Sequence, residues 1–237
     1  MSRAEANRKN GGQLETLDDL SKAVNYNKWI VSLIQPYLGG RVLEVGCGTG
    51  NIIQHFTDKE VLGVDIDPTH LRIAREKFKN KKNIKFQIFD LGKSLKTFKK
   101  FNPDTIVCIN VLEHIEKDER FIRECAALLA PGGRLILFVP AMPSIFGEMD
   151  RTYGHFRRYT KAELVQKISK KFHVESEKYL NISGIFGWWL NGKLLKRKII
   201  PQSQMLLFDK VFKFIFILES LIPKPIGLSV FVVGRKP

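Results

Sequence analysis

Short apolar runs alternate with amphipathic segments along most of the chain, and this alternation constrains the fold more than any other feature. The runs are bounded by glycine, proline or charged residues, which is typical of buried strands. Strands are expected at 41–46, 60–65, 83–90, 104–110 and 134–140, and again at 173–180 and 228–236. Helices are expected at 17–38, 68–79, 118–130 and 159–172, and a further helix is expected to begin at 51–56. Strands separated by helices predict an α/β fold with a mostly parallel sheet and helices on both faces.

The chain, 1–237, is expected to form one domain, although two segments differ from the rest in composition. Residues 1–16 are polar and predicted to be loose, without the apolar core of a signal peptide. Residues 182–227 form an insert between the last two strands, with two adjacent tryptophans, the basic run KLLKRK and an apolar helix at 205–222. Its four charged residues make that helix a poor membrane span and a fair amphipathic surface helix. The insert is predicted to be a lid over a ligand site, a dimer interface or a contact with an anionic membrane.

The charge of the chain is strongly positive, with a formal net value of +15. Between Arg72 and Lys100, eleven Lys and Arg residues stand against only Glu76 and Asp90. This balance favours an anionic partner, either nucleic acid or an acidic membrane, and equally fits a surface that keeps the protein soluble. Neither a disulfide framework nor a metal site is indicated by the three cysteines, which are far apart: Cys47, Cys108 and Cys125. We expect a cytoplasmic protein, peripheral at the inner membrane surface if the insert contacts lipid.

A glycine loop, VLEVGCGTGN, follows the first predicted strand. Its glycines let the backbone turn sharply and approach a ligand closely. Asp65 ends the second strand and is placed to accept hydrogen bonds from ribose hydroxyls, as also happens in nicotinamide-binding folds. The spacing here is G-x-G-x-G and not the G-x-G-x-x-G of a loop that binds a pyrophosphate, which argues against a nicotinamide cofactor. Glu44 inside the first strand suits a cationic ligand such as a sulfonium–amino-acid cofactor. A second acid, Asp90, ends the third strand and is predicted to meet an adenine amino group.

These motifs, followed by FDLGK, INVLEHI and LLAPGGRLILFVP in order, resemble the class I S-adenosylmethionine-dependent methyltransferases of type 11 and 12, including the ubiquinone-pathway O-methyltransferases. The resemblance covers most of the chain. It implies a seven-stranded sheet whose last strand is antiparallel, with S-adenosylmethionine as cofactor and S-adenosylhomocysteine as product. It implies contacts to the methionine part of the cofactor from Glu44, Gly46, Cys47, Gly48 and Gly50, and to the ribose and adenine from Asp65, Ile66, Asp90 and Leu91. Asn110 is expected to close the site. Tyr26 is expected either to cover the methionine carboxylate or to be a core aromatic.

The stretch YGHFRRYT, residues 153–160, gathers ionisable and aromatic side chains after the fifth strand, at the sheet edge where such folds bind ligands. His155 is the first candidate for a catalytic base, and His114 in NVLEHI is the second, with a structural role in its loop as the alternative. Substrate contacts are expected from Tyr153, Arg157, Arg158 and Tyr159, since arginines bind phosphate or carboxylate in fork geometry. The alternative is that an arginine pairs with Glu148 or Asp150 and the loop folds on itself.

The resemblance and the motifs together predict methyl transfer to a small-molecule or lipid-linked acceptor, at oxygen. An RNA methyltransferase is the second hypothesis, which the positive charge supports. The sequence NVLEH after strand four and the lack of interleaved aromatics make nucleic acid the weaker partner. A non-catalytic binding protein with the same fold is the third. No metal ligand set is expected, because the five histidines are dispersed. The sequence leaves the acceptor and the oligomeric state open.

Overall fold

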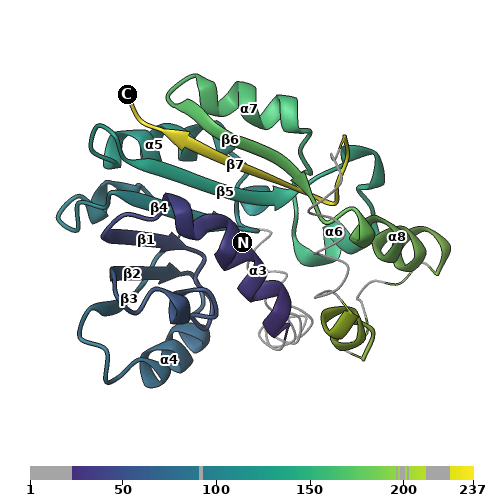
Figure 1. The fold of residues 1–237 in the computed structure, drawn as a ribbon, viewed down its shortest axis with the longest axis horizontal. Coiled ribbons are helices and arrows are strands. Elements are labelled where there is room, and N and C mark those ends of the chain that lie inside the picture. The colour runs from purple at the N-terminus through teal and green to yellow at the C-terminus, as the bar shows by residue number, and fades with distance from the viewer. Residues whose placement is uncertain (1–22, 91–92, 196, 198–200, 202, 212–224) are drawn as a thin grey trace.

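A seven-stranded sheet forms the centre of the computed structural model, which describes residues 23–90, 93–195, 197, 201, 203–211 and 225–237 (Figure 1). The strand order is β3-β2-β1-β4-β5-β7-β6. The strands are β1 (Arg41–Val45), β2 (Glu60–Asp65), β3 (Ile84–Ile88), β4 (Thr105–Ile109), β5 (Arg134–Pro140), β6 (His173–Leu180) and β7 (Ser229–Arg235). β1 to β5 pair in parallel, and β7 lies antiparallel between β5 and β6. The predicted mostly parallel sheet with an antiparallel last strand is confirmed.

Helices cover both faces of the sheet, as expected. The helices α3 (Val24–Ile34) and α4 (Pro68–Lys77) pack on one face, and α5 (Asp118–Leu128) and α7 (Lys161–Ser169) pack on the other. Two shorter helices, α6 (Glu148–Tyr153) and α8 (Ser183–Trp189), follow β5 and β6 along the chain. Successive side chains of a strand point to opposite faces. Leu43 of β1 therefore packs with residues of α5 and α7, whereas its neighbour Val42 packs with residues of α3 and α4. The fold thus has a core on each side of the sheet.

Local signals in the sequence explain where two helices begin. The carboxylate of Asp67 accepts a hydrogen bond from the Thr69 N–H (2.7 Å) at the start of α4. The Thr160 hydroxyl accepts one from the Glu163 N–H (3.1 Å) at the start of α7. Shorter 3₁₀ turns lie at Gln35–Tyr37, Ile53–His55, Leu95–Phe98, Leu112–His114 and Pro143–Ile145, and a π turn follows α8 at Leu190–Leu194.

The expected helix after the glycine loop is wrong. Residues 51–56 contain only the 3₁₀ turn Ile53–His55, and a hydrogen bond from the Lys59 N–H to the Phe56 carbonyl (3.0 Å) turns the chain toward β2. Only nine residues separate Gly50 from Glu60, the first residue of β2, so the connection is too short for a regular helix and a turn.

The late insert begins with α8 and returns through a helical segment at 203–211. The rest of the predicted apolar helix, at 212–222, lies outside the described residues, as do residues 1–16. Within the described parts of the chain, no helix is long and apolar enough to cross a membrane. The assignment of the whole chain to one domain stays a prediction.

Candidate active site

The glycine loop is tied to the neighbouring strand. The N–H groups of Gly46 and Cys47 donate to the Val64 carbonyl (2.8 and 3.1 Å), and the Gly48 N–H donates to Asp65 Oδ2 (2.8 Å). Gly46 has φ of 75°, and a Cβ there would collide with the side chain of Val111. Gly48 has φ of 52°, and the space beside it is open. The loop therefore leaves a ligand room at Gly48, where glycine tolerates the left-handed backbone.

Asp65 is held in a network at the end of β2. Its Oδ1 accepts from the Asp67 N–H (2.9 Å) and lies 3.9 Å from Nδ1 of His70, a buried residue of α4. Burial alone would raise the pKa of Asp65, but the nearby His70 imidazole and the backbone hydrogen bonds from Asp67 and Gly48 hold it below its usual value. Asp65 is therefore an ionised, preorganised acceptor, which suits ribose hydroxyls.

The predicted adenine contacts are only partly described. Ile66 is half-buried next to Asp65, whereas Asp90 is exposed two residues after the end of β3. Leu91 lies outside the described residues. The adenine contacts of these three residues stay predictions.

Glu44 is a buried carboxyl with an unmatched oxygen. Its side chain is almost inaccessible, and Oε2 has no hydrogen-bond partner. Burial, with a smaller contribution from the charge of Asp65, raises the pKa of Glu44 well above its usual value. An unpaired polar atom in this position costs free energy unless a ligand satisfies it. The acid and the open space at Gly48 fit the cationic amino-acid end of S-adenosylmethionine. Cys47 beside them is buried with a raised pKa, which favours a packing role over reactivity.

Tyr26 joins the N-terminal helix to the site. Its ring lies 5.4 Å from that of Trp29 in the core under α3, while its hydroxyl hydrogen-bonds Ser229 and lies near Glu113. The start of α3 is capped from the insert: the Tyr26 N–H donates to Asp209 Oδ1 (2.9 Å) and the Asn25 N–H to Oδ2 (3.3 Å). Segment 203–211 therefore holds the helix that carries Tyr26. A contact between Tyr26 and the cofactor stays a prediction.

The loop after β4 brings Asn110 and His114 to the same edge of the sheet. Asn110 has φ of 52°, a conformation that asparagine tolerates, and its N–H donates to the Phe138 carbonyl (2.8 Å). His114 is largely buried and hydrogen-bonds the Gly154 backbone; burial, then the nearby His155, lowers its pKa to about 3. A neutral imidazole bonded to the adjacent loop favours the structural role for His114. Closure of the cofactor site by Asn110 stays a prediction.

His155 is aligned by a buried carboxylate. It follows Gly154, which ends α6 with φ of 81°, and its Nδ1 lies 2.9 Å from Asp150 Oδ1. Burial would raise the pKa of Asp150, but the hydrogen bond from His155 and the charge of Arg158 hold it below its usual value. An ionised carboxylate only accepts, so Nδ1 carries the proton and Nε2 of the neutral ring has a free lone pair. This is the arrangement of a histidine oriented as a general base.

Glu113 is the site residue that the sequence analysis missed. It is fully buried, neither carboxyl oxygen has a hydrogen-bond partner, and Oε1 lies 4.0 Å from His155 Nε2. Burial raises the pKa of Glu113 to about 8, so the carboxyl is mostly protonated at neutral pH. The two halves of the site are linked here, because the Phe156 N–H donates to the Glu113 carbonyl (2.8 Å).

Glu113 also belongs to a group of three side chains that could hold a metal ion. One ligand atom each from Glu113, His114 and His155 lies within 4.8 Å of the others. No metal ligand set was expected, because the five histidines are dispersed along the sequence. The fold brings His114 and His155 together, with ring centroids 4.7 Å apart.

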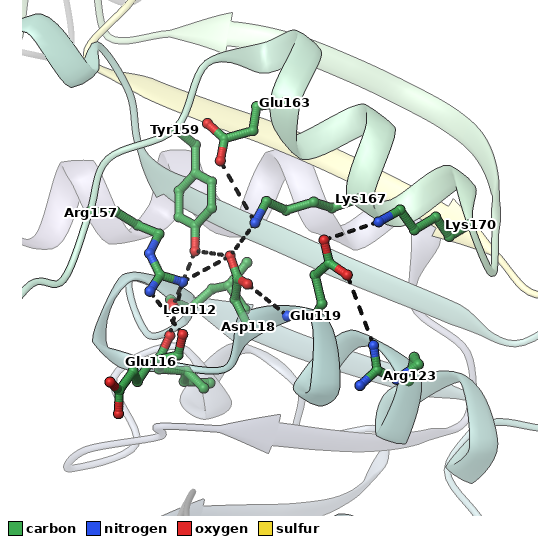
Figure 2. A network of polar contacts seen from close by, with 11 residues as sticks. Leu112, Glu116, Asp118, Glu119, Arg123, Arg157, Tyr159, Glu163, Lys167 and Lys170 are labelled. Carbon is green, nitrogen blue, oxygen red and sulfur yellow. Dashed lines mark hydrogen bonds and ion pairs between the residues drawn. The ribbon is translucent and has the colours of Figure 1, made fainter.

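Three of the residues predicted to contact the substrate are bonded within the protein. Arg158 is buried and donates from Nε to Asp150 (2.7 Å) and from Nη1 to the Ala141 carbonyl (3.0 Å). Figure 2 shows Arg157 and Tyr159 converging on Asp118, at 3.0 Å each. Tyr159 has no exposed surface. The pairing of Arg158 with Asp150 is the alternative that the sequence offered, whereas the bonds of Arg157 and Tyr159 to Asp118 were not expected.

Tyr153 keeps a position suited to the acceptor. It is half-buried, with its ring 6.1 Å from that of His155 and 6.2 Å from that of Trp188. A wall of the acceptor pocket at Tyr153 stays a prediction.

Comparison with known proteins places this site in a family. Residues 43–135 match the model of a methyltransferase domain. Residues 43–135 therefore carry the signature of a methyltransferase domain, and the seven-stranded fold and the glycine loop agree with the class I S-adenosylmethionine-dependent methyltransferases that the motifs resemble. S-adenosylmethionine is the cofactor of this class, and Glu44, Gly48 and Asp65 fit it as described above.

Individual relatives are more distant. A Coxiella burnetii protein named ubiquinone biosynthesis O-methyltransferase is 35% identical over 100 residues, covering 41% of this chain and 42% of the relative. The matched stretch thus spans about two fifths of that relative's length. An Idiomarina loihiensis protein of the same name is 22% identical over 187 residues, or 73% of this chain and 75% of the relative. The crystal structure of coclaurine N-methyltransferase bound to N-methylheliamine and SAH is similar in fold, with a TM-score of 0.61 at 15% identity, covering 89% of this chain and 72% of that one.

Proposed function

We propose that this protein transfers the methyl group of S-adenosylmethionine to a hydroxyl oxygen of a small-molecule or lipid-linked acceptor. The observation that carries the proposal is the pair formed by His155 and the buried Asp150, 2.9 Å apart. A hydroxyl must lose its proton as it attacks, so an oxygen acceptor needs a base, whereas a neutral amine carries its own lone pair. A histidine oriented by a carboxylate supplies that base.

The cofactor supplies an electrophilic methyl group on a sulfonium. The protein's part is to hold the acceptor oxygen in line with that methyl group, and positioning alone provides much of the rate. Glu44 and Asp65 hold the two ends of the cofactor, and His155 Nε2 takes the acceptor's proton. Asp150 stabilises the imidazolium that forms, because it is already ionised and hydrogen-bonded to Nδ1.

A phenolic hydroxyl is the acceptor group that suits this base. Phenols ionise near pH 10 and aliphatic alcohols far above that, so proton transfer to an imidazole costs about 5 kcal/mol for a phenol and much more for an alcohol. The relatives named ubiquinone biosynthesis O-methyltransferase support transfer to oxygen.

A lipid-linked acceptor is supported by the apolar surface of the insert. Phe186 and Trp189 of α8 and Leu207 of segment 203–211 are well exposed. Exposed aromatic and aliphatic side chains favour contact with lipid tails, and basic residues elsewhere in the chain favour an anionic headgroup. Peripheral contact with an anionic membrane is therefore part of the proposal, and the cytoplasmic location stays a prediction.

The test replaces His155 and measures methyl transfer from labelled S-adenosylmethionine to a lipid extract. His155→Ala is expected to lower kcat by about 100-fold or more while the Kd for S-adenosylmethionine stays unchanged. His173→Ala is the matched control, because His173 is exposed at the start of β6, and its activity is expected to stay within twofold. Turnover of His155→Ala within a few fold of the natural protein would exclude His155 as the base.

A further inference from the structure

A tryptophan of the insert covers the arginine behind the catalytic pair. Trp188 lies on α8, and the Cζ atom of Arg158 sits 4.2 Å from the centre of its ring. Only 3% of Arg158 is exposed, so the indole shields one face of a guanidinium that has little other access to water. This contact joins the insert, which lies between the last two strands, to the loop after β5.

The same guanidinium shares an oxygen with the catalytic base. Arg158 Nε donates to Asp150 Oδ1 at 2.7 Å, and His155 Nδ1 donates to that same oxygen at 2.9 Å. The second oxygen, Oδ2, accepts from the Gly147 N–H at 3.0 Å. The direction of the Asp150 carboxylate, and with it the tautomer and tilt of His155, therefore depends on where Arg158 is held.

We infer that Trp188 is a positioning residue for His155, acting through Arg158 and Asp150. This inference rests on the proposed function, in which His155 is the base. Without the indole, water reaches the open face of the guanidinium and competes for its N–H groups. Arg158 then samples other directions, and the shared oxygen no longer fixes the His155 ring. The insert thus completes the active site.

Other groups also face the His155 ring, and a test must separate their effects on His155 from that of Trp188. Glu113 lies 4.0 Å from Nε2, and the rings of His114 and Tyr153 lie 4.7 and 6.1 Å away. Tyr153 also contacts Trp188 at 6.2 Å, which gives the indole a second route to the same histidine. A Trp188 variant leaves the side chains of Glu113, His114 and Tyr153 themselves unchanged, so a change seen at His155 reports on the loss of the indole, whether it acts through Arg158 or through Tyr153.

The next residue on α8 provides a matched control. Trp189 is 44% exposed, and its described ring contact is with Phe186 at 6.4 Å. Trp188→Leu and Trp189→Leu remove the same side chain from adjacent positions of one helix. Trp188→Phe keeps an aromatic ring over Arg158 and is expected to retain most of the function.

The first readout is the nitrogen NMR spectrum of the His155 imidazole in the protein bound to S-adenosylhomocysteine, assigned by its loss in His155→Ala. The natural protein, Trp189→Leu and Trp188→Phe are expected to show one tautomer with the proton on Nδ1. Trp188→Leu is expected to show a mixture of tautomers, while its Kd for S-adenosylhomocysteine is unchanged. An unaltered tautomer in Trp188→Leu would overturn the inference without touching the proposed function.

The second readout is a double-mutant cycle on methyl transfer to a lipid extract. Trp188→Leu is expected to lower kcat about tenfold in the natural background and less than twofold in His155→Ala, because the two residues act through one chain of contacts. Equal losses in both backgrounds would overturn the inference. Full activity of His155→Ala alone would overturn the proposed base instead, so the two failures can be told apart.

Discussion

The buried carboxyl of Glu113 gives the sharpest prediction for stability. Burial raises the pKa of this group from 4.5 to about 8. For a group whose folded-state pKa is raised, stability is fully present below the unfolded pKa and is lost as pH rises toward the folded pKa. The natural protein should therefore lose stability between pH 4.5 and pH 8 as its unfolded chain releases this proton. Glu113→Gln keeps the shape of the side chain and cannot ionise, so it should lack this loss.

The size of the effect follows from the two pKa values. Integrating the linkage relation with pKa values of 4.5 and about 8 gives a stability advantage of Glu113→Gln over the natural protein that grows by roughly 3 kcal/mol from pH 6 to pH 9. Most of this change falls below pH 8, and the difference levels off above pH 9.

The assay is urea unfolding of the ligand-free protein at each pH, with Glu116→Gln as control, since Glu116 is an exposed acid three residues away. The control should show no trend. A flat difference between Glu113→Gln and the natural protein would refute the buried, protonated state of Glu113.

Four further predictions follow from other contacts. Because the pKa of Glu44 is raised, binding of a cationic ligand should make this carboxyl release a proton. Glu44→Gln should therefore weaken S-adenosylmethionine binding at least tenfold and abolish that proton release, which calorimetry in two buffers measures. Unchanged proton release would contradict a raised pKa for Glu44. Asp209→Ala should remove the cap of α3, costing about 1 kcal/mol and speeding exchange of the Asn25 and Tyr26 amides about fivefold, with protection unchanged if the cap is irrelevant. Tyr159→Phe should lower the free energy of unfolding by about 1 kcal/mol, because the Tyr159 hydroxyl donates a hydrogen bond to Asp118. The KM for the acceptor should stay unchanged, and a raised KM would support a contact between Tyr159 and the substrate. Vesicles with anionic lipid should pellet the protein at low salt and less so at high salt, and failure to pellet at low salt would remove the membrane contact.

The sheet could be predicted from the sequence because its signals are local. The expected strand ranges 41–46, 60–65, 104–110 and 134–140 agree to within one residue at each end with β1, β2, β4 and β5. The prediction of a helix beginning at 51–56 was wrong because the number of residues in the connection, and not their apolar pattern, limits its structure. Since β2 begins at Glu60, there is room only for a 3₁₀ turn.

The site could be predicted only where residue type and position suffice. The sequence proposed Glu44 and Asp65 from the glycine motif and His155 from its place after β5, and their roles stay predictions. Glu113 was missed because an acid in a turn is usually exposed; its burial comes from the 153–156 loop, 40 residues later. Arg158 was assigned to the substrate because its charge suits an anion. The sequence offered Glu148 and Asp150 as alternative partners for an arginine, and only the fold shows that Arg158 pairs with Asp150.

The proposed transfer to an acceptor hydroxyl is tested most directly by identifying the atom to which the methyl group becomes bonded. The protein is incubated with S-adenosylmethionine carrying a labelled methyl group and a cell extract, and labelled products are separated into lipid, water-soluble and RNA fractions. The account predicts label in the lipid or small-molecule fraction, as a methoxy group that NMR identifies. Label found in RNA, or on nitrogen or carbon in any fraction, would contradict transfer to an acceptor hydroxyl.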